Sequence, residues 1–215
     1  EKGWDENKLD MFRRHIIQLG NSGVYVIYDE LEGKEAVTWS YLLHTVELPM
    51  EMKELPNDVQ VTGKNKAGGV SVAHLFSSAK TEQAIADTFF CAPTNWKNVT
   101  NAQGKALKYP NHWHFSSTTV PCKVARFLTV MDTHGNNRPD MKVVRNGNTV
   151  QVGDWIINCN LTEKGKAAIT VTNKSEKVSL NYDAGKKEGA TILTDQVKGK
   201  QISKVLTDYL PDFEI

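Results

Sequence analysis

The sequence predicts an all-β protein: an antiparallel β-sandwich followed by a smaller C-terminal β-domain. Three observations carry this prediction. Short apolar runs of strand length recur along the whole chain, turn-forming residues separate them, and helical periodicity is rare. The 215 residues suffice for one large domain or for a large and a small one. With 40% hydrophobic and 24% charged residues, the composition is that of a globular protein and not of a disordered chain.

The first two thirds of the chain contain segments with the length and residue types of strands. They are rich in β-branched and aromatic residues, and clusters of Gly, Asn, Asp and Lys bound them. These segments are residues 24–28, 39–46, 70–76 and 124–131. Such even spacing of strands is typical of a sandwich.

The last third predicts β-hairpins. The dipeptide Asn146-Gly147 lies between two β-forming segments, and a type I′ turn is expected there because Asn and Gly tolerate positive φ. Residues 155–159 form a further strand. Residues 168–172 and 177–182 alternate between apolar and polar side chains, so each is expected to have one buried and one solvated face.

At most one or two short helices are expected. Residues 81–90 have Ser78 or Thr81 near their start, where a helix N-cap would stand. Residues 202–210 carry apolar side chains at helical spacing and are followed by Pro211, which would end a helix.

The segment Thr133-His134-Gly135-Asn136-Asn137-Arg138-Pro139 has the composition of a linker. We therefore expect two domains, residues 1–135 and residues 136–215.

Charge and cysteine content narrow the function classes. The net charge is +1, from 26 basic and 25 acidic residues without a clustered basic excess, so no nucleic-acid partner is expected. No apolar run is long enough to span a bilayer. The three cysteines are widely spaced without a Cys-x-x-Cys pair, which disfavours a zinc ribbon or redox motif. The chain starts without Met, as expected of a processed or excised piece of a longer protein.

Three motifs follow one another in the first part of the chain. The first is Arg13-Arg14-His15 with apolar neighbours, the second ends in Tyr28-Asp29-Glu30-Leu31, and the third contains Trp39 and Leu42-Leu43-His44. In order and spacing they resemble a stretch of the heparinase II/III-like polysaccharide lyases. The later segments 111–115 and 127–130 resemble that family's subsequent strands, so that the resemblance covers roughly residues 12–131.

The resemblance implies that the chain is the C-terminal half of the large, supersandwich-like lyase domain with the small β-domain that ends such chains. Family members also have an N-terminal (α/α) toroid, which supplies a catalytic Tyr and His. The first sandwich strands supply another His, in a pattern like His-x-Asp-x-(Asn/Gly)-Ser-Phe, and divalent-metal ligands that include an Asp before Ser-Gly. Neither pattern occurs here, so no catalytic residue and no cofactor is expected in this chain.

The resemblance also implies partners and a location. The toroid of the same parent chain and an acidic polysaccharide, such as a glycosaminoglycan, are the expected partners, and the parent is expected to be periplasmic or secreted. Such lyases break a glycosidic bond by β-elimination next to a uronic acid. This chemistry needs cationic or hydrogen-bonding groups at the carboxylate and a base for the C5 proton.

Arg13, Arg14 and His44 are candidate substrate contacts. Adjacent residues on a strand point to opposite faces, so one arginine can reach a sulfate or carboxylate. The alternative is that an arginine pairs with a local acid such as Asp29 or Glu30. His44 stands at a strand end, where site residues often lie, but the more common role of such a residue is to hydrogen-bond within a half-buried strand.

Trp113 is the fourth candidate, because Trp113 and Trp96 can stack on sugar rings, although packing is the more common role of Trp. His112 and His114 lie two residues apart on one face of a strand, a spacing that can bind zinc. Two ligands do not make a site, and no third is evident from the sequence, so no metal site is predicted.

Three functions remain open. The first is the β-sandwich region of a lyase that acts on acidic polysaccharide, inert alone, which supports the toroid and one wall of the substrate cleft. The second is an independent carbohydrate-binding module, and the third is a structural spacer.

Overall fold

The chain divides into two compact units, Glu1–Asp140 (unit 1) and Met141–Ile215 (unit 2). The expected boundary after residue 135 falls a few residues earlier. The computed structural model describes residues 9–46, 48–56, 58–87, 100–105, 112–186, 191–197 and 200–206. These residues form strands, turns and loops with no helix among them, which confirms the all-β prediction. Accordingly, this part of the chain contains no helix that could cross a membrane.

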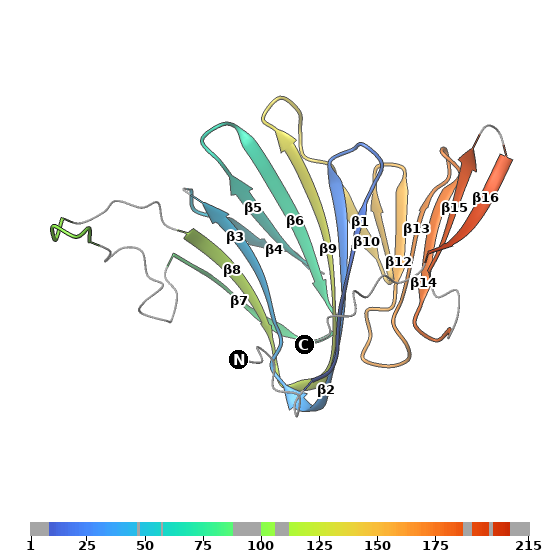
Figure 1. Ribbon diagram of the computed structural model, residues 1–215, viewed down its shortest axis with the longest axis horizontal. Helices are drawn as coiled ribbons and strands as arrows, with labels where there is room; N and C mark the ends of the chain where they lie inside the picture. Colours follow the sequence, from blue (N-terminus) through green and yellow to red (C-terminus); the bar gives the residue numbers. More distant parts are fainter. Residues whose placement is uncertain are drawn as a thin grey trace. The chain divides into compact units, whose positions relative to one another are not determined.

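Unit 1 contains a six-stranded antiparallel sheet (Figure 1). Its strands, in spatial order, are β1 (Leu9–Gln18), β2 (Val24–Val37), β9 (Cys122–Gly135), β6 (Gly69–Ser77), β5 (Val59–Lys64) and β4 (Glu51–Glu54). The long strands β2 and β9 pair along most of their length in the middle of this sheet. β9 runs through Gly135, so the first three residues of the expected linker belong to a strand.

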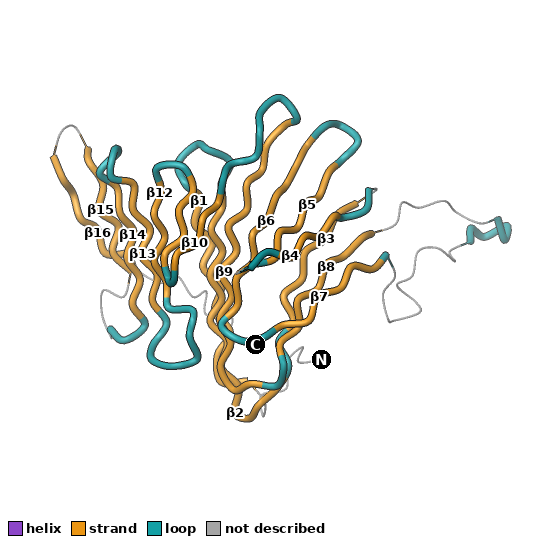
Figure 2. Tube along the Cα trace, turned by 180° about the vertical axis from the view of Figure 1, so that it is seen from behind, coloured by secondary structure: helices purple, strands orange, loops and turns teal. Residues whose placement is uncertain are grey.

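The second layer of unit 1 is a three-stranded sheet of β3 (Ser40–Val46), β8 (His112–Thr119) and β7 (Thr81–Ala86). In Figures 1 and 2 these three strands stand apart from the six-stranded sheet, as the second layer of a sandwich. β7 occupies the first part of the segment 81–90, so the helix expected there is wrong for those residues, and residues 88–90 lie outside the described residues. Pairing with β8 supplies its backbone partners, and Ile85 packs against the core.

The core of unit 1 lies between the two sheets. Leu31, Leu75 and Phe127 from the larger sheet join Tyr41 and Phe115 from the smaller one, and all five are buried. The rings of Tyr41 and Phe127 lie 5.7 Å apart. A fully buried side chain of this size contributes about 1.5–3 kcal/mol. We call the face of the six-stranded sheet that carries Leu31 and Phe127 the inner face, and the opposite one the outer face.

Unit 2 is a seven-stranded antiparallel meander in which each strand pairs with the next along the chain. Its strands are β10 (Val143–Asn146), β11 (Thr149–Val152), β12 (Trp155–Cys159), β13 (Ala168–Asn173), β14 (Val178–Asp183), β15 (Thr191–Val197) and β16 (Lys200–Leu206). Residues 202–206 belong to β16, so the helix expected at 202–210 is wrong there, and residues 207–210 lie outside the described residues.

The turn between β10 and β11 differs from the expected one by one residue. Asn146 pairs with Thr149, so Gly147 and Asn148 are the central residues. Gly147 has a φ of 59°, and Asn148 is not among the described residues with positive φ. Positive φ at the first central position alone is the pattern of a type II′ turn, which requires Gly there. The hairpin prediction holds in place, but the type I′ assignment is wrong.

Candidate functional site

The first two motifs lie side by side in the β1–β2 hairpin. Antiparallel pairing places Arg14 opposite Asp29 and Arg13 opposite Glu30. Because side chains alternate along a strand, Arg14 and Asp29 share the inner face with Leu31, whereas Arg13 and Glu30 share the outer face. Both arginines therefore meet the local acids that the sequence indicated as their alternative partners.

The inner-face group centres on Arg14. Its Nε donates to Oδ1 of Asp29 at 2.7 Å, and one terminal nitrogen donates to Oδ2 at 2.8 Å, a bidentate pair. The guanidinium also lies over the ring of Tyr41, 5.4 Å from its centre. The hydrogen bond to Asp29 raises the pKa of Arg14, and burial raises the pKa of the Tyr41 hydroxyl. Arg14 is thus a fixed, permanently charged group.

Arg14 is nevertheless open to solvent. Its side chain is 40% exposed, although Asp29 is almost completely buried. The inner-face residues two positions away on either side, Phe12 and Ile16, are 47% and 66% exposed. We call Phe12, Arg14 and Ile16 the β1 strip. An exposed cation between apolar side chains suits a ligand that combines an anionic group with an apolar face.

The outer-face group has a buried carboxylate, although its Arg13 side chain is 34% exposed. Glu30 is only 4% exposed, and its Oε1 lies 2.7 Å from Nε2 of His15 and 3.9 Å from a terminal nitrogen of Arg13. Arg126, the β9 residue opposite Glu30, is buried as well. The ring of His15 stacks on Tyr28 at 6.0 Å. Removing a partner from a buried ion pair is strongly destabilising, and a carboxylate buried this far offers little of itself to a substrate.

His44, His112 and His114 gather on the three-stranded sheet. His44 on β3 and His114 on β8 are direct cross-strand partners, with ring centres 6.0 Å apart and ring planes inclined by 37°. His112 lies two residues before His114 and shares its face. This face points away from the core, since Leu43 and Trp113 on the same strands pack against it. The pairing supplies the third imidazole that the sequence did not reveal.

The remaining tryptophan candidates do not form a stacking platform in the described residues. Trp113 is partly buried and packs against the core between the two sheets, the packing role that competed with sugar stacking in the prediction. Trp39, which begins the third motif, also packs there, and its Nε1 donates to the carbonyl oxygen of Cys122. Trp96 lies outside the described residues.

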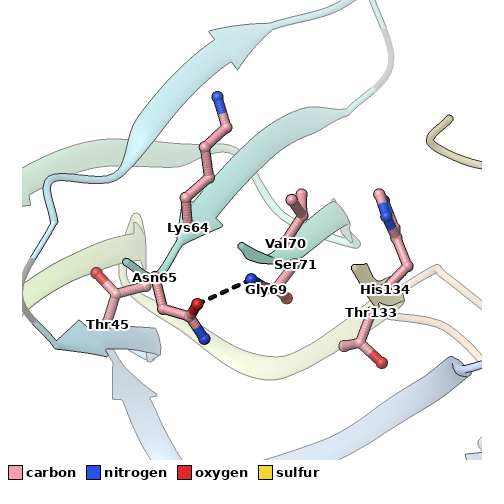
Figure 3. Close-up of a pocket in the computed structure, with 9 residues that line it drawn as sticks. Thr45, Lys64, Asn65, Gly69, Val70, Ser71, Thr133 and His134 are labelled. Atoms are coloured by element: carbon pink, nitrogen blue, oxygen red, sulfur yellow. Dashed lines mark hydrogen bonds between the residues drawn. The ribbon is translucent and has the colours of Figure 1, made fainter. Parts of the chain in front are cut away.

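A pocket of about 530 Å³ lies in unit 1. It is lined by Thr45, Gly63, Lys64, Asn65, Gly69, Val70, Ser71, Thr133 and His134. Figure 3 shows that Lys64 and His134 extend one way, whereas Asn65 and Thr133 extend the other. Oδ1 of Asn65 accepts from the Gly69 amide at 2.8 Å, and the Thr133 hydroxyl donates to the Gly23 carbonyl at 2.8 Å. The Asn65 side chain holds the turn between β5 and β6, and the Thr133 side chain holds the turn between β1 and β2. These polar groups therefore do not converge on one ligand position.

Two acid–base clusters on the outer face have little signal in the sequence. Nδ1 of His74 lies 2.6 Å from Oδ2 of Asp58, and both side chains are largely buried. Asp132 pairs with Arg138 and lies 3.8 Å from Nε2 of His134. Asp132 and His134 are two residues apart, so the sequence indicates part of the second cluster. Asp58 and His74 meet only through strand pairing, and no local motif marks their contact.

Neither known family models nor curated proteins contain a match to this chain.

Proposed function

We propose that the chain is the C-terminal β-sandwich region of a heparinase II/III-like polysaccharide lyase. In this role it supports the toroid and forms one wall of the cleft in which an acidic, uronic-acid-containing polysaccharide undergoes β-elimination. Unit 1 is the sandwich part, and unit 2 is the terminal β-domain. The chain alone is inert, because no residue in it corresponds to the family's catalytic patterns.

The arrangement of the motifs supports this proposal. The Arg-Arg-His motif is on β1, the Asp-Glu-Leu motif on β2, and the Leu-Leu-His motif on β3. The first two contact each other through the Arg14–Asp29 pair, so the motif residues depend on one another physically. A chance match of separate short motifs would not require such complementarity.

The observation that carries the proposal is the half-exposed guanidinium of Arg14 in the β1 strip. Asp29 fixes the guanidinium and the Tyr41 ring packs against one side of it. Little side-chain entropy is therefore lost when Arg14 binds a ligand. Its exposed edge can donate to a sulfate or carboxylate of the polysaccharide, while Phe12 offers an apolar surface to a sugar ring.

Under this proposal the chemistry is divided within the parent. The toroid and the earlier strands supply the base, the acid and a divalent metal, and the β1 strip holds anionic groups of the polymer. The proposal also places the parent in the periplasm or outside the cell, where such polymers are accessible.

The test is binding of heparan sulfate oligosaccharides to the chain by calorimetry at low salt. Arg14→Gln is expected to weaken binding by about three- to fivefold, the value of one exposed charge contact. The matched control is Arg145→Gln, a partly exposed arginine on β10 in unit 2, which should bind as the unmutated chain does. Unchanged binding in Arg14→Gln would remove the β1 strip from the proposal.

A turnover assay tests the claim that the chain is inert. The ultraviolet absorbance of unsaturated uronate should not rise when the chain is incubated with heparan sulfate or related polymers. Robust product formation would overturn the assignment to a region without catalytic residues.

An independent carbohydrate-binding module is the second candidate. The β1 strip favours it, because a cation and an apolar ring lie on one exposed strand. Such a module would also bind neutral glycans through Phe12. Its affinity for them should be unchanged in Arg14→Gln. Binding restricted to acidic polymers favours the lyase region.

A further inference from the structure

The turn between β10 and β11 carries the only Asn-Gly dipeptide of the sequence, Asn146-Gly147. Asn146 is the last residue of β10 and pairs with Thr149, so Gly147 and Asn148 alone form the turn. Asn146 and Gly147 are both exposed to solvent. β10 also lies at an edge of the described sheet of unit 2, where local opening costs less than in a central strand.

The backbone nitrogen of Gly147 is accessible. Asn146 and Thr149 form the last ladder pair of the hairpin, and the amide of the first turn residue does not belong to that ladder. Among the described residues, no heavy atom beyond the two chain neighbours lies within 4 Å of the position that a Cβ of Gly147 would occupy. The side chain of Asn146 can therefore approach this nitrogen without displacing another group.

The side chain of Asn146 is also able to move. Other asparagines in turns use their side-chain oxygen to fix the backbone. Oδ1 of Asn65 accepts from the Gly69 amide, and Oδ1 of Asn173 accepts from the Ser175 amide. No comparable bond holds the Asn146 side chain in the part of the chain that the structure describes. Its Cγ can therefore rotate towards the nitrogen of the next residue.

Arg145 places a positive charge beside the same turn. Its Nε donates to the carbonyl oxygen of Gly147 at 2.8 Å. A fixed cation lowers the barrier of a step in which a nearby group becomes anionic. A backbone nitrogen that loses its proton and attacks a carbonyl carbon passes through such a step.

We propose that Asn146 is a site of spontaneous deamidation. The Gly147 nitrogen attacks Cγ of Asn146, the bond between Cγ and Nδ2 breaks, and ammonia leaves with the proton that the Gly147 nitrogen gives up. Water then opens the cyclic imide at one of its two carbonyl groups and leaves aspartate or isoaspartate at position 146. The reaction needs water alone as co-reactant, and it does not depend on the proposed lyase function.

The products change the hairpin in two ways. Each of them carries a carboxylate where asparagine was neutral. Isoaspartate also routes the main chain through its side-chain carbon atoms, which adds one backbone atom before Gly147. The pairing of residue 146 with Thr149 requires a two-residue turn, so the added atom disturbs this register. We therefore expect β10 to separate from β11 more readily after conversion to isoaspartate.

Peptide mapping by mass spectrometry of the whole chain, incubated in warm buffer, tests the proposal. Conversion at residue 146 should precede conversion at every other asparagine. It should be faster at mildly alkaline than at mildly acidic pH, because a base must remove the proton of the Gly147 nitrogen. Enzymatic methylation of isoaspartate distinguishes the two products. Amide hydrogen exchange in β10 should be faster in the converted protein than in fresh protein.

Asn146→Gln should abolish conversion at this position on the same time scale, because the longer side chain would have to close a larger ring. It should also abolish the change in hydrogen exchange on incubation. Asn148→Gln is the matched control in the same turn, and it should leave the rate of conversion at residue 146 unchanged.

Earlier conversion of another asparagine would overturn the proposal. Conversion of Asn146 in the urea-unfolded chain but not in the folded protein would also overturn it, because the hairpin would then protect this residue. Unchanged hydrogen exchange in β10 after conversion to isoaspartate would reject the expected loosening of the strand.

Discussion

The two faces of the β1–β2 hairpin pair a nearly buried carboxylate with basic side chains in different ways. Each face has a nearly buried carboxylate on β2 and an arginine opposite it on β1. On the inner face Arg14 matches Asp29 with two short hydrogen bonds and remains 40% exposed. On the outer face His15 and Arg13 surround Glu30, and Arg126 on the next strand is buried opposite it.

The difference shows how adjacent residues of one motif come to have different roles. A buried carboxylate beside a buried arginine contributes to the fold, because removing it takes a compensating charge from a cation in a region that excludes water. A carboxylate that holds a half-exposed guanidinium fixes the position of a group that a ligand can reach. The hairpin therefore separates a stabilising face from a candidate binding face by side-chain alternation alone.

The largest effect is expected from Glu30→Ala. It removes the carboxylate that lies against His15 and Arg13 and opposite the buried Arg126, so a buried cation loses a compensating charge, which costs about 3 kcal/mol of the free energy of unfolding. Urea denaturation followed by circular dichroism measures it. Glu35→Ala, an exposed glutamate on the same strand, is the control and should change stability by less than about 0.5 kcal/mol. Equal stability of the two variants would contradict the distinction between the faces.

Asp29→Ala should cost less, about 1.5 kcal/mol, the value of hydrogen bonds to a charged group. The partner Arg14 already reaches solvent, so its charge can be hydrated when Asp29 is lost. The same denaturation experiment measures the loss. A cost equal to or above that of Glu30→Ala would show that exposure of the cation does not relieve the inner face.

The sequence alone predicted part of this arrangement. Alternation along a strand places Arg13 and Arg14 on opposite faces, and Asp29 and Glu30 were the local acids available to them. The pairing register was not predictable. A shift by one residue would have exchanged the two acids between faces, and register depends on which side chains the assembled sheet buries.

Long-range pairing explains what the sequence did not predict. His44 faces His114 only because β3 pairs with β8, and Asp58 reaches His74 only because β5 pairs with β6. The expected helix at residues 81–90 followed local preference in a Thr-Glu-Gln-Ala-Ile-Ala segment, and pairing with β8 overrode it. Local patterns therefore predicted most strands, whereas contacts between distant strands assembled the clusters.

Arg14→Lys tests whether the inner face needs a guanidinium or only a positive charge. Lysine keeps the charge but cannot make the bidentate pair with Asp29, so stability should fall by less than about 1 kcal/mol. The melting temperature measures this cost. Arg13→Lys on the outer face is the matched control, because the Arg13–Glu30 separation of 3.9 Å is already too long for a bidentate pair. A larger loss in Arg13→Lys would reverse the assignment of roles.

The smallest effect concerns His44, a titratable group beside like groups instead of a carboxylate. Its pKa is lowered from the ordinary value of 6.5, first by burial and then by the imidazoles of His114 and His112. As the pH falls below 6.5, the unfolded chain binds a proton more readily than the folded one, so stability decreases through that range. His44→Gln should therefore lose less stability than the unmutated protein between neutral and mildly acidic pH.

Thermal melts of the two proteins across this pH range measure the difference. The control Leu42→Ala should show the same pH dependence of stability as the unmutated protein. An NMR titration of the His44 imidazole gives the cause directly, with a midpoint expected below 6.5. A midpoint at or above that value would mean that a negative group outweighs the two imidazoles. His44 would then resemble His15 on the outer face of the hairpin, which lies against the carboxylate of Glu30, and the contrast between a carboxylate-paired and a clustered imidazole would fail.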